Sequence, residues 1–140
     1  MLSMRKILVP IDLWPARTRV LVEAQEFATK FSATIDLLYV YTQPALLAPE
    51  VLEWLANTAR EQLGKFESQA RAEGMAVSAS YCEPGDPATA IVERAESGGY
   101  DLLVLGTHGR TGLSHLLTGS VAEKVVRRAR CAVLTVRTAE

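Results

Sequence analysis

Cysteine is scarce in this sequence, which has only Cys82 and Cys131, without a CxxC pattern or a metal-ligand spacing. Each lies beside or within an apolar run typical of a strand, so we interpret both as buried thiols in a reducing compartment rather than as a disulfide. The apolar run near the N-terminus ends at Pro10 and is too short for a signal peptide or a membrane span. We therefore expect a cytoplasmic protein.

The sequence also has no large excess of positive or negative charge. The 15 basic and 16 acidic residues give a net charge of −1, and no block of like charge exceeds three residues. Nucleic acids and anionic membranes both demand a basic face, so neither is expected as the main partner. The length of 140 residues and the hydrophobic content of 49% suit one compact domain, residues 1–140, with one core and one site.

The usual motifs of phosphate-transferring and hydrolytic enzymes are absent. There is no GxxxxGK[ST] loop, and GLSHL lacks the final glycine of a nucleophile elbow. His108 and His115 fall in one loop without an evident third ligand, so no metal site is expected. Asp12, His108 and Arg110 are the only groups that could position water, and they form no recognisable catalytic arrangement. The sequence therefore predicts at most a weak catalyst.

What the sequence does contain is a regular alternation of two hydrophobic patterns. Short apolar runs predict strands, and segments whose apolar residues recur every three or four positions predict the helices between them. This order favours an α/β fold with an open, doubly wound, five-stranded parallel sheet, Rossmann-like, with strand order 3-2-1-4-5 and helices on both faces. The expected strands are residues 6–11, 33–41, 75–82, 102–105 and 131–136, and the expected helices are residues 15–32, 50–74, 87–97 and a segment that begins near 120. We expect Asp86 to cap the third helix, with Pro87 at its first position, and the leucines of the second helix to belong to the core.

A glycine-rich loop follows the fourth expected strand, with glycines at 106, 109, 112 and 119, and the next helix starts near Ser120. Glycines leave peptide N–H groups uncovered, and a helix N-terminus adds about half a positive charge, so the segment favours a phosphate chain. Ligands of open α/β sheets bind where the strand order reverses, here between strands one and four. Asp12 and Gly106 follow these two strands, so both should line one crevice.

The segments KILVPID, EPGDPATAIVERA and GTHGRTGLSHLLTGSVAEKVVRRARCAVLTVR resemble the universal stress protein family, and the likeness covers essentially the whole chain. Within that family the pattern G-x2-G-x9-G-[ST] distinguishes the members that bind ATP. The pattern is complete here as Gly106, Gly109, Gly119 and Ser120. The resemblance implies that these four residues surround the triphosphate.

The same resemblance implies roles for other positions. Asp12 would accept hydrogen bonds from the ribose or adenine side, and the backbone near Val40 would touch the adenine. Any Mg²⁺ would arrive with the nucleotide, held by phosphate oxygens and water. Simpler interpretations of two of these residues remain as alternatives. Asp12 would then cap the following helix, and Arg110 would be a solvated side chain of the loop. The candidate ligand-binding residues are Pro10, Asp12, Val40, Gly106, His108, Gly109, Arg110, Gly119, Ser120 and Val121.

The last expected strand, residues 131–136, would be an edge of the sheet. Its sequence CAVLTV has no proline or inward charge, and a bare apolar edge invites pairing with another chain. We expect a homodimer through this strand, as the resemblance also implies. The leading interpretation is an ATP-binding stress-response module that couples nucleotide occupancy to an unknown protein partner. The alternatives are a slow ATP hydrolase or nucleotidyl-transferring enzyme, and a dimeric scaffold whose pocket is blocked by Trp14.

Overall fold

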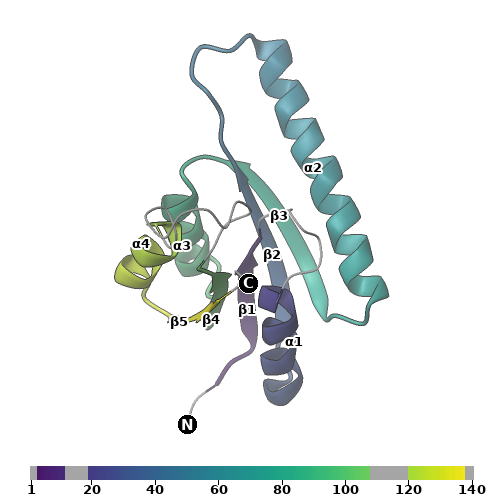
Figure 1. Ribbon diagram of the computed structural model, residues 1–140, viewed down its shortest axis with the longest axis vertical. Helices are drawn as coiled ribbons and strands as arrows, with labels where there is room; N and C mark the ends of the chain where they lie inside the picture. Colours follow the sequence, from purple (N-terminus) through teal and green to yellow (C-terminus); the bar gives the residue numbers. More distant parts are fainter. Residues whose placement is uncertain (1–2, 12–18, 108–119, 138–140) are drawn as a thin grey trace.

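The computed structural model describes residues 3–11, 19–107 and 120–137, and strands and helices alternate along these segments (Figure 1). The elements lie close to the ranges expected from the hydrophobic patterns. Their bounds are β1 (Lys6–Pro10), α1 (Arg19–Phe31), β2 (Thr34–Tyr41), α2 (Pro49–Ala72), β3 (Val77–Pro84), α3 (Pro87–Ser97), β4 (Leu102–Gly106), α4 (Ser120–Arg128) and β5 (Ala132–Val136).

The five strands form one parallel sheet in the order β3-β2-β1-β4-β5, which confirms the predicted topology. The central strand β1 pairs with β2 on one side and with β4 on the other. Leu8 shows both pairings, because it lies opposite Asp36 of β2 and Leu103 of β4. The two edges of the sheet are β3 and β5.

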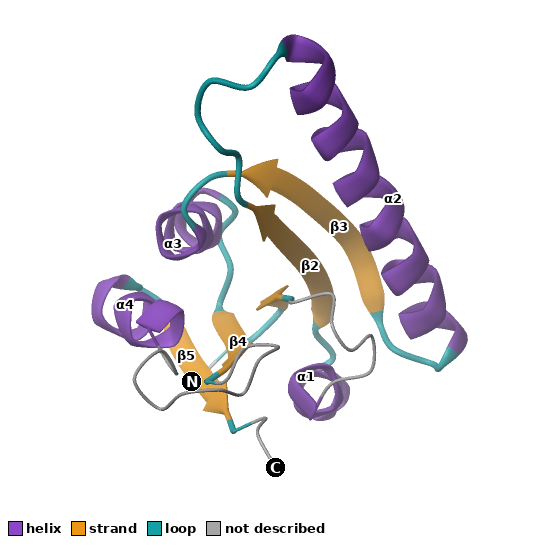
Figure 2. Ribbon diagram, turned by 45° about the horizontal axis from the view of Figure 1, so that its top comes forward, coloured by secondary structure: helices purple, strands orange, loops and turns teal. Residues whose placement is uncertain are grey.

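Helices cover both faces of the sheet, as Figure 2 shows. Side chains alternate along a strand, so neighbouring residues of β1 enter different cores. Ile7 and Val9 pack in the core beneath α1 and α2, whereas Leu8 packs in the core beneath α3 and α4. All three side chains are fully buried. Their burial on both faces explains why β1 is a continuous apolar run rather than an alternating one.

The start of α3 follows the predicted capping pattern. Asp86 precedes the helix, and its carboxylate accepts a hydrogen bond from Thr89 N at 3.1 Å, while Pro87 occupies the first helical position. The preceding strand differs from the prediction, because β3 continues past Cys82 to Pro84, which pairs with Tyr41. A proline is tolerated there because β3 is an edge strand and Pro84 is its last residue.

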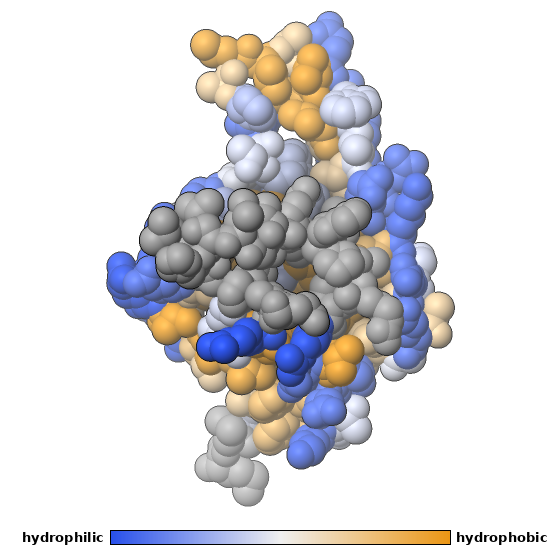
Figure 3. Space-filling view, viewed as in Figure 1, coloured by the Kyte–Doolittle hydropathy of each residue, from blue (hydrophilic) through white to orange (hydrophobic). Residues whose placement is uncertain are grey.

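The first half of α2 also differs from the prediction that its leucines belong to the core. Leu52 and Leu55 are only half-buried, and fully buried positions begin at Ala59. The reason is geometric, since α2 starts beyond the end of the sheet and reaches it only further along its length (Figure 1). Apolar residues gather over this end of the molecule (Figure 3), where Trp54 and Leu46 are exposed.

The two cysteines are unpaired, as predicted, but they are not fully buried. Cys82 and Cys131 are both half-buried, and neither forms a disulfide. Their partial removal from water raises the pKa of each thiol, because it disfavours the charged thiolate. Both residues lie at sheet edges, Cys82 in β3 and Cys131 directly before β5.

One buried acid interrupts the apolar interior. Asp36 of β2 is 7% exposed, and Tyr100, which precedes β4, donates a hydrogen bond from its hydroxyl to Asp36 Oδ2 at 2.5 Å. The Lys6 ammonium lies 4.5 Å from the centroid of the Tyr100 ring and donates to the carbonyl oxygen of Gly98 at 2.6 Å. These contacts join β1, β2 and the chain that enters β4.

Candidate functional site

The sheet divides between β1 and β4 at its carboxyl edge. The register pairs β1 with β2 along its whole length but pairs β1 with β4 only at Ile7 and Leu8. Beyond the strands, Ile11 N donates to Leu38 O of β2 at 2.9 Å, while Thr107 N donates to Val136 O of β5 at 3.0 Å. The backbone after β1 and the backbone after β4 therefore bond to strands on opposite sides of the division. Such a point is where open α/β sheets bind their ligands.

Five of the predicted site residues lie in the described part of the chain, and for four of them the surroundings are also described. Pro10 ends β1, and Gly106 ends β4 opposite Val136. Val40 of β2 and Val121 in the first turn of α4 are half-buried, and both pack against the core beneath α3 and α4. Val40 and Val121 therefore border the same core on one face of the sheet. Pro10 and Gly106 mark the two strands that part there.

The other predicted site residues fall outside the described residues or lack a described side chain. Ser120 is the first residue of α4, and its side chain is not described. The remaining five positions all fall within residues 12–18 and 108–119, which the structure does not describe. They are Asp12, His108, Gly109, Arg110 and Gly119. The contacts of these residues stay predictions from the sequence.

The start of α4 supplies the electrostatic character of this edge. The first N–H groups of a helix have no acceptor within the helix, and the helix dipole places partial positive charge there. Glu123 lies in this first turn, but its carboxylate pairs with Arg127 one turn along, with Nη2 and Oε2 3.0 Å apart. Lys124, the next residue, adds an exposed positive charge. The segment that links Gly106 to α4 thus leads into a helix end suited to an anion.

Ile11 and Thr107 were not among the predicted site residues, although their backbone bonds define the division of the sheet. Each directly follows the last residue of a strand at the switch point. Their position after these strands is the feature from which the sequence could have identified them, and it does not depend on residue type. Neither side chain carries a charge, which is why a search for chemically reactive residues passes over both.

Within residues 3–11, 19–107 and 120–137, no group of three or more His, Cys, Asp or Glu side chains is arranged to hold a metal ion. None of the described helices is long and apolar enough to cross a membrane.

Comparison with known proteins decides the family. The model of the Universal stress protein family matches residues 4–137. The chain belongs to the universal stress protein family. Universal stress protein MJ0531 of Methanocaldococcus jannaschii is 35% identical over 140 residues, which cover 95% of this chain and 82% of that protein.

Solved universal stress protein structures share the fold. UspA from Lactobacillus plantarum superposes with a TM-score of 0.77 at 26% identity, covering 98% of this chain and 100% of that one. A universal stress protein in complex with cAMP gives a TM-score of 0.73 at 26% identity, with 97% and 98% covered. The family assignment confirms the resemblance seen in the sequence, and the second structure shows that a relative of this universal stress protein binds an adenine nucleotide.

Proposed function

We propose that this universal stress protein binds ATP, accompanied by Mg²⁺, at the carboxyl edge of the sheet between β1 and β4. The observation that carries the proposal is the division of the sheet, with Ile11 bonded toward β2 and Thr107 bonded toward β5. Gly106 and the start of α4 bracket the segment that completes the G-x2-G-x9-G-S pattern. The cAMP complex of a relative supports an adenine nucleotide as the ligand class.

The proposed contacts follow from the positions of the described residues. The phosphates lie against the glycine loop and the N–H groups of α4, where positive potential and uncovered peptide groups coincide. The base lies toward Val40, which is half-buried and follows by two residues Leu38, the partner of Pro10 at the end of β1. Mg²⁺ is held by phosphate oxygens and water rather than by a dedicated protein cage. Asp12 meets the ribose, as the resemblance implies.

The biological role that we propose is regulatory. Nucleotide occupancy of a cytoplasmic homodimer is coupled to a protein partner during stress, and any ATP hydrolysis is slow because no catalytic motif accompanies the phosphate site. A hydrolase on the same fold is the second candidate. Steady-state turnover faster than about one per second, the low end of ordinary enzyme rates, would favour that candidate.

The nucleotide content of purified protein tests the binding proposal directly. Denatured protein is expected to release an adenine nucleotide, seen as absorbance at 260 nm and identified by chromatography of the released molecule. Nucleotide-free protein is then titrated calorimetrically with ATP and Mg²⁺, with GTP as the control for the base. A protein that carries no nucleotide and gives no heat with ATP would contradict the proposal.

The homodimer is proposed to form through β5. This strand stays in register with β4 over all its five residues, and Ala132 and Thr135 are exposed. Because Val136 O faces β4, where it accepts from Thr107 N, the backbone of Thr135 faces the open edge by alternation. Thr135 therefore offers the N–H group that a second β5 strand would use.

Replacing Thr135 by proline is expected to convert the dimer to a monomer, because proline removes that N–H from the open edge and leaves the bonds to β4 in place. Light scattering coupled to size-exclusion chromatography measures the mass of each species. Thr135→Val, which keeps the N–H group, is the matched control and should remain dimeric. A wild-type protein that is monomeric throughout a concentration series would refute the dimer.

A further inference from the structure

The other edge strand of the sheet, β3, could also pair with a strand of another chain, as β5 could. An edge strand carries a row of backbone donors and acceptors that another strand can pair with. In the described part of the chain β3 pairs with β2 alone, and it is as long as β2. Something must distinguish this edge from β5 if the protein is to form an assembly of finite size.

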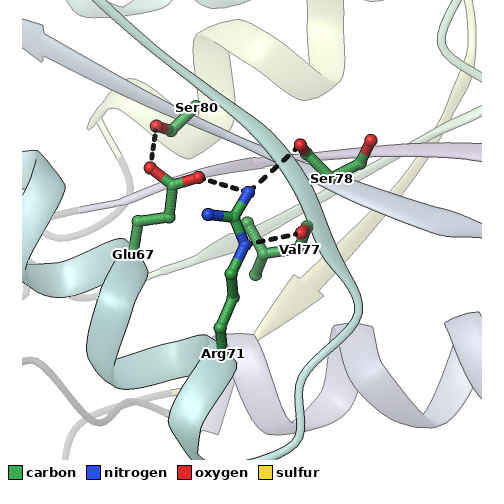
Figure 4. A network of polar contacts seen from close by, with 5 residues as sticks. All are labelled: Glu67, Arg71, Val77, Ser78 and Ser80. Carbon is green, nitrogen blue, oxygen red and sulfur yellow. Dashed lines mark hydrogen bonds and ion pairs between the residues drawn. The ribbon is translucent and has the colours of Figure 1, made fainter.

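The amino end of β3 is irregular. Ile35 lies opposite Val77 and the next residue, Asp36, lies opposite Ala79, so Ser78 is an extra residue in β3. A bulge of this kind disrupts the ladder and bends the strand. The carbonyl oxygens of Val77 and Ser78 accept from one side chain, Arg71 of α2, at 3.0 Å to Nε and 3.2 Å to Nη2 (Figure 4).

Glu67 fixes the guanidinium in this position. Its Oε2 lies 2.6 Å from Arg71 Nη2, and its Oε1 accepts from the Ser80 hydroxyl at 2.7 Å. The Glu67 side chain is 17% exposed and the Arg71 side chain is 49% exposed, so water screens the carboxylate less than it screens the guanidinium. Figure 4 shows the resulting chain of contacts, which ties α2 to β3 at Val77, Ser78 and Ser80.

The carboxyl end of β3 is closed in another way. Gly85 N donates to Tyr41 O at 3.1 Å, so the backbone of Gly85 faces β2. By alternation the backbone of Pro84 faces outward, and proline has no N–H to offer there.

At the amino end, Ala76 O accepts from Ile35 N of β2 at 3.0 Å. By the same alternation Val77 O, which accepts from Arg71, faces the open edge. The β3 edge is thus obstructed at one end by the Arg71 guanidinium and at the other by Pro84. In contrast, β5 has neither a proline nor a register shift.

We propose that Arg71, held by Glu67, closes the β3 edge to a second copy of this chain. Pairing through one edge about a two-fold axis ends at a dimer, whereas two open edges would let sheets add in an open series. The ion pair therefore limits the size of the assembly. The inference concerns β3 alone and holds whether or not β5 pairs as proposed above.

Arg71→Met tests the role of the guanidinium, because methionine keeps much of the side-chain length but donates no hydrogen bond. We expect the weight-average mass of the folded variant to rise with concentration to at least about twice the wild-type value, as β3 pairs with β3 of a second copy. Arg127→Ala is the matched control, since it breaks another Arg–Glu pair at i,i+4, between Arg127 and Glu123 of α4, away from β3. It should leave the mass unchanged.

Two further variants keep the test decisive. Thr135→Pro obstructs β5, so a mass increase caused by Arg71→Met should persist in the double variant if it arises at β3. Loss of the increase in that background, or a folded Arg71→Met protein with wild-type mass at all concentrations, would overturn the proposal. If circular dichroism shows that Arg71→Met is unfolded, Arg71→Lys replaces it, because a lysine keeps the charge near Glu67 but lacks the planar fork that spans two carbonyls.

Discussion

Replacing Gly109 by glutamate is expected to weaken ATP binding about a hundredfold, close to 3 kcal/mol, because a carboxylate would occupy space proposed for the phosphates. Gly109 is the second glycine of the G-x2-G-x9-G-S pattern, between Gly106 of β4 and the start of α4. Two like charges within about 4 Å repel by some 1 to 4 kcal/mol near a protein surface, and the added side chain also excludes the ligand sterically. Calorimetric titration of nucleotide-free protein gives the affinity.

Gly64→Glu is the matched control for this variant. Gly64 lies in α2, and a Cβ atom at that position would meet no atom within 4 Å apart from its chain neighbours and the backbone of its own helix. The control adds the same side chain and the same charge to an exposed helix position, so it should bind ATP as the wild type does. If both variants bind ATP with wild-type affinity, the phosphates do not lie against the glycine loop.

Removal of the Tyr100 hydroxyl is expected to destabilise the protein by about 2 kcal/mol, because it leaves the Asp36 carboxylate buried without that donor. Asp36 is 7% exposed, and the bond from Tyr100 Oη is 2.5 Å long. Urea unfolding of Tyr100→Phe measures the change. The same substitution should cost less in an Asp36→Ala background, where no carboxylate is orphaned. Equal costs in the two backgrounds would show that the hydroxyl acts through other contacts.

The same hydroxyl links stability to alkaline pH. Burial and then the hydrogen bond to Asp36 raise the pKa of Tyr100 above its ordinary value of 10.0. The unfolded tyrosine therefore ionises first as the pH rises, so the stabilisation is complete below about pH 10 and declines above it. Tyr100→Phe should lack this decline. Both proteins should carry Cys82→Ala and Cys131→Ala, because the raised pKa of the thiols adds a similar decline from about pH 9.

Topology was the most predictable part of this protein. The local hydrophobic periodicity predicts each strand and helix, and the rules for connections in parallel sheets then allow few strand orders. The cap at Asp86 was equally clear, because capping depends on a few neighbouring residues. Burial along α2 was not predictable in this way. Leu52 and Leu63 have the same helical spacing, but only Leu63 reaches the sheet, and where the sheet ends is a property of the whole fold.

The candidate site was predictable in part. Pairing Asp12 with Gly106 required only the strand order, and the structure confirms that β1 and β4 are neighbours. The division of the sheet rests on backbone bonds of Ile11 and Thr107, which carry no signature in residue type. The contacts of Arg71 at the β3 edge could not be predicted either, because they depend on a register shift at Ser78 that no local sequence pattern indicates.

The central position of β1 has a consequence for synthesis of the chain on the ribosome. β1 meets β2 soon after it emerges, but β4, which covers its other side, begins only at Leu102. A parallel sheet of this order is dominated by contacts between residues distant in sequence, which slows folding and exposes apolar surface meanwhile. The boundary between β1 and β4 is therefore completed late, and it is the boundary where the nucleotide is proposed to bind. A nucleotide available to the nascent protein would then stabilise a boundary of the sheet that forms late in synthesis.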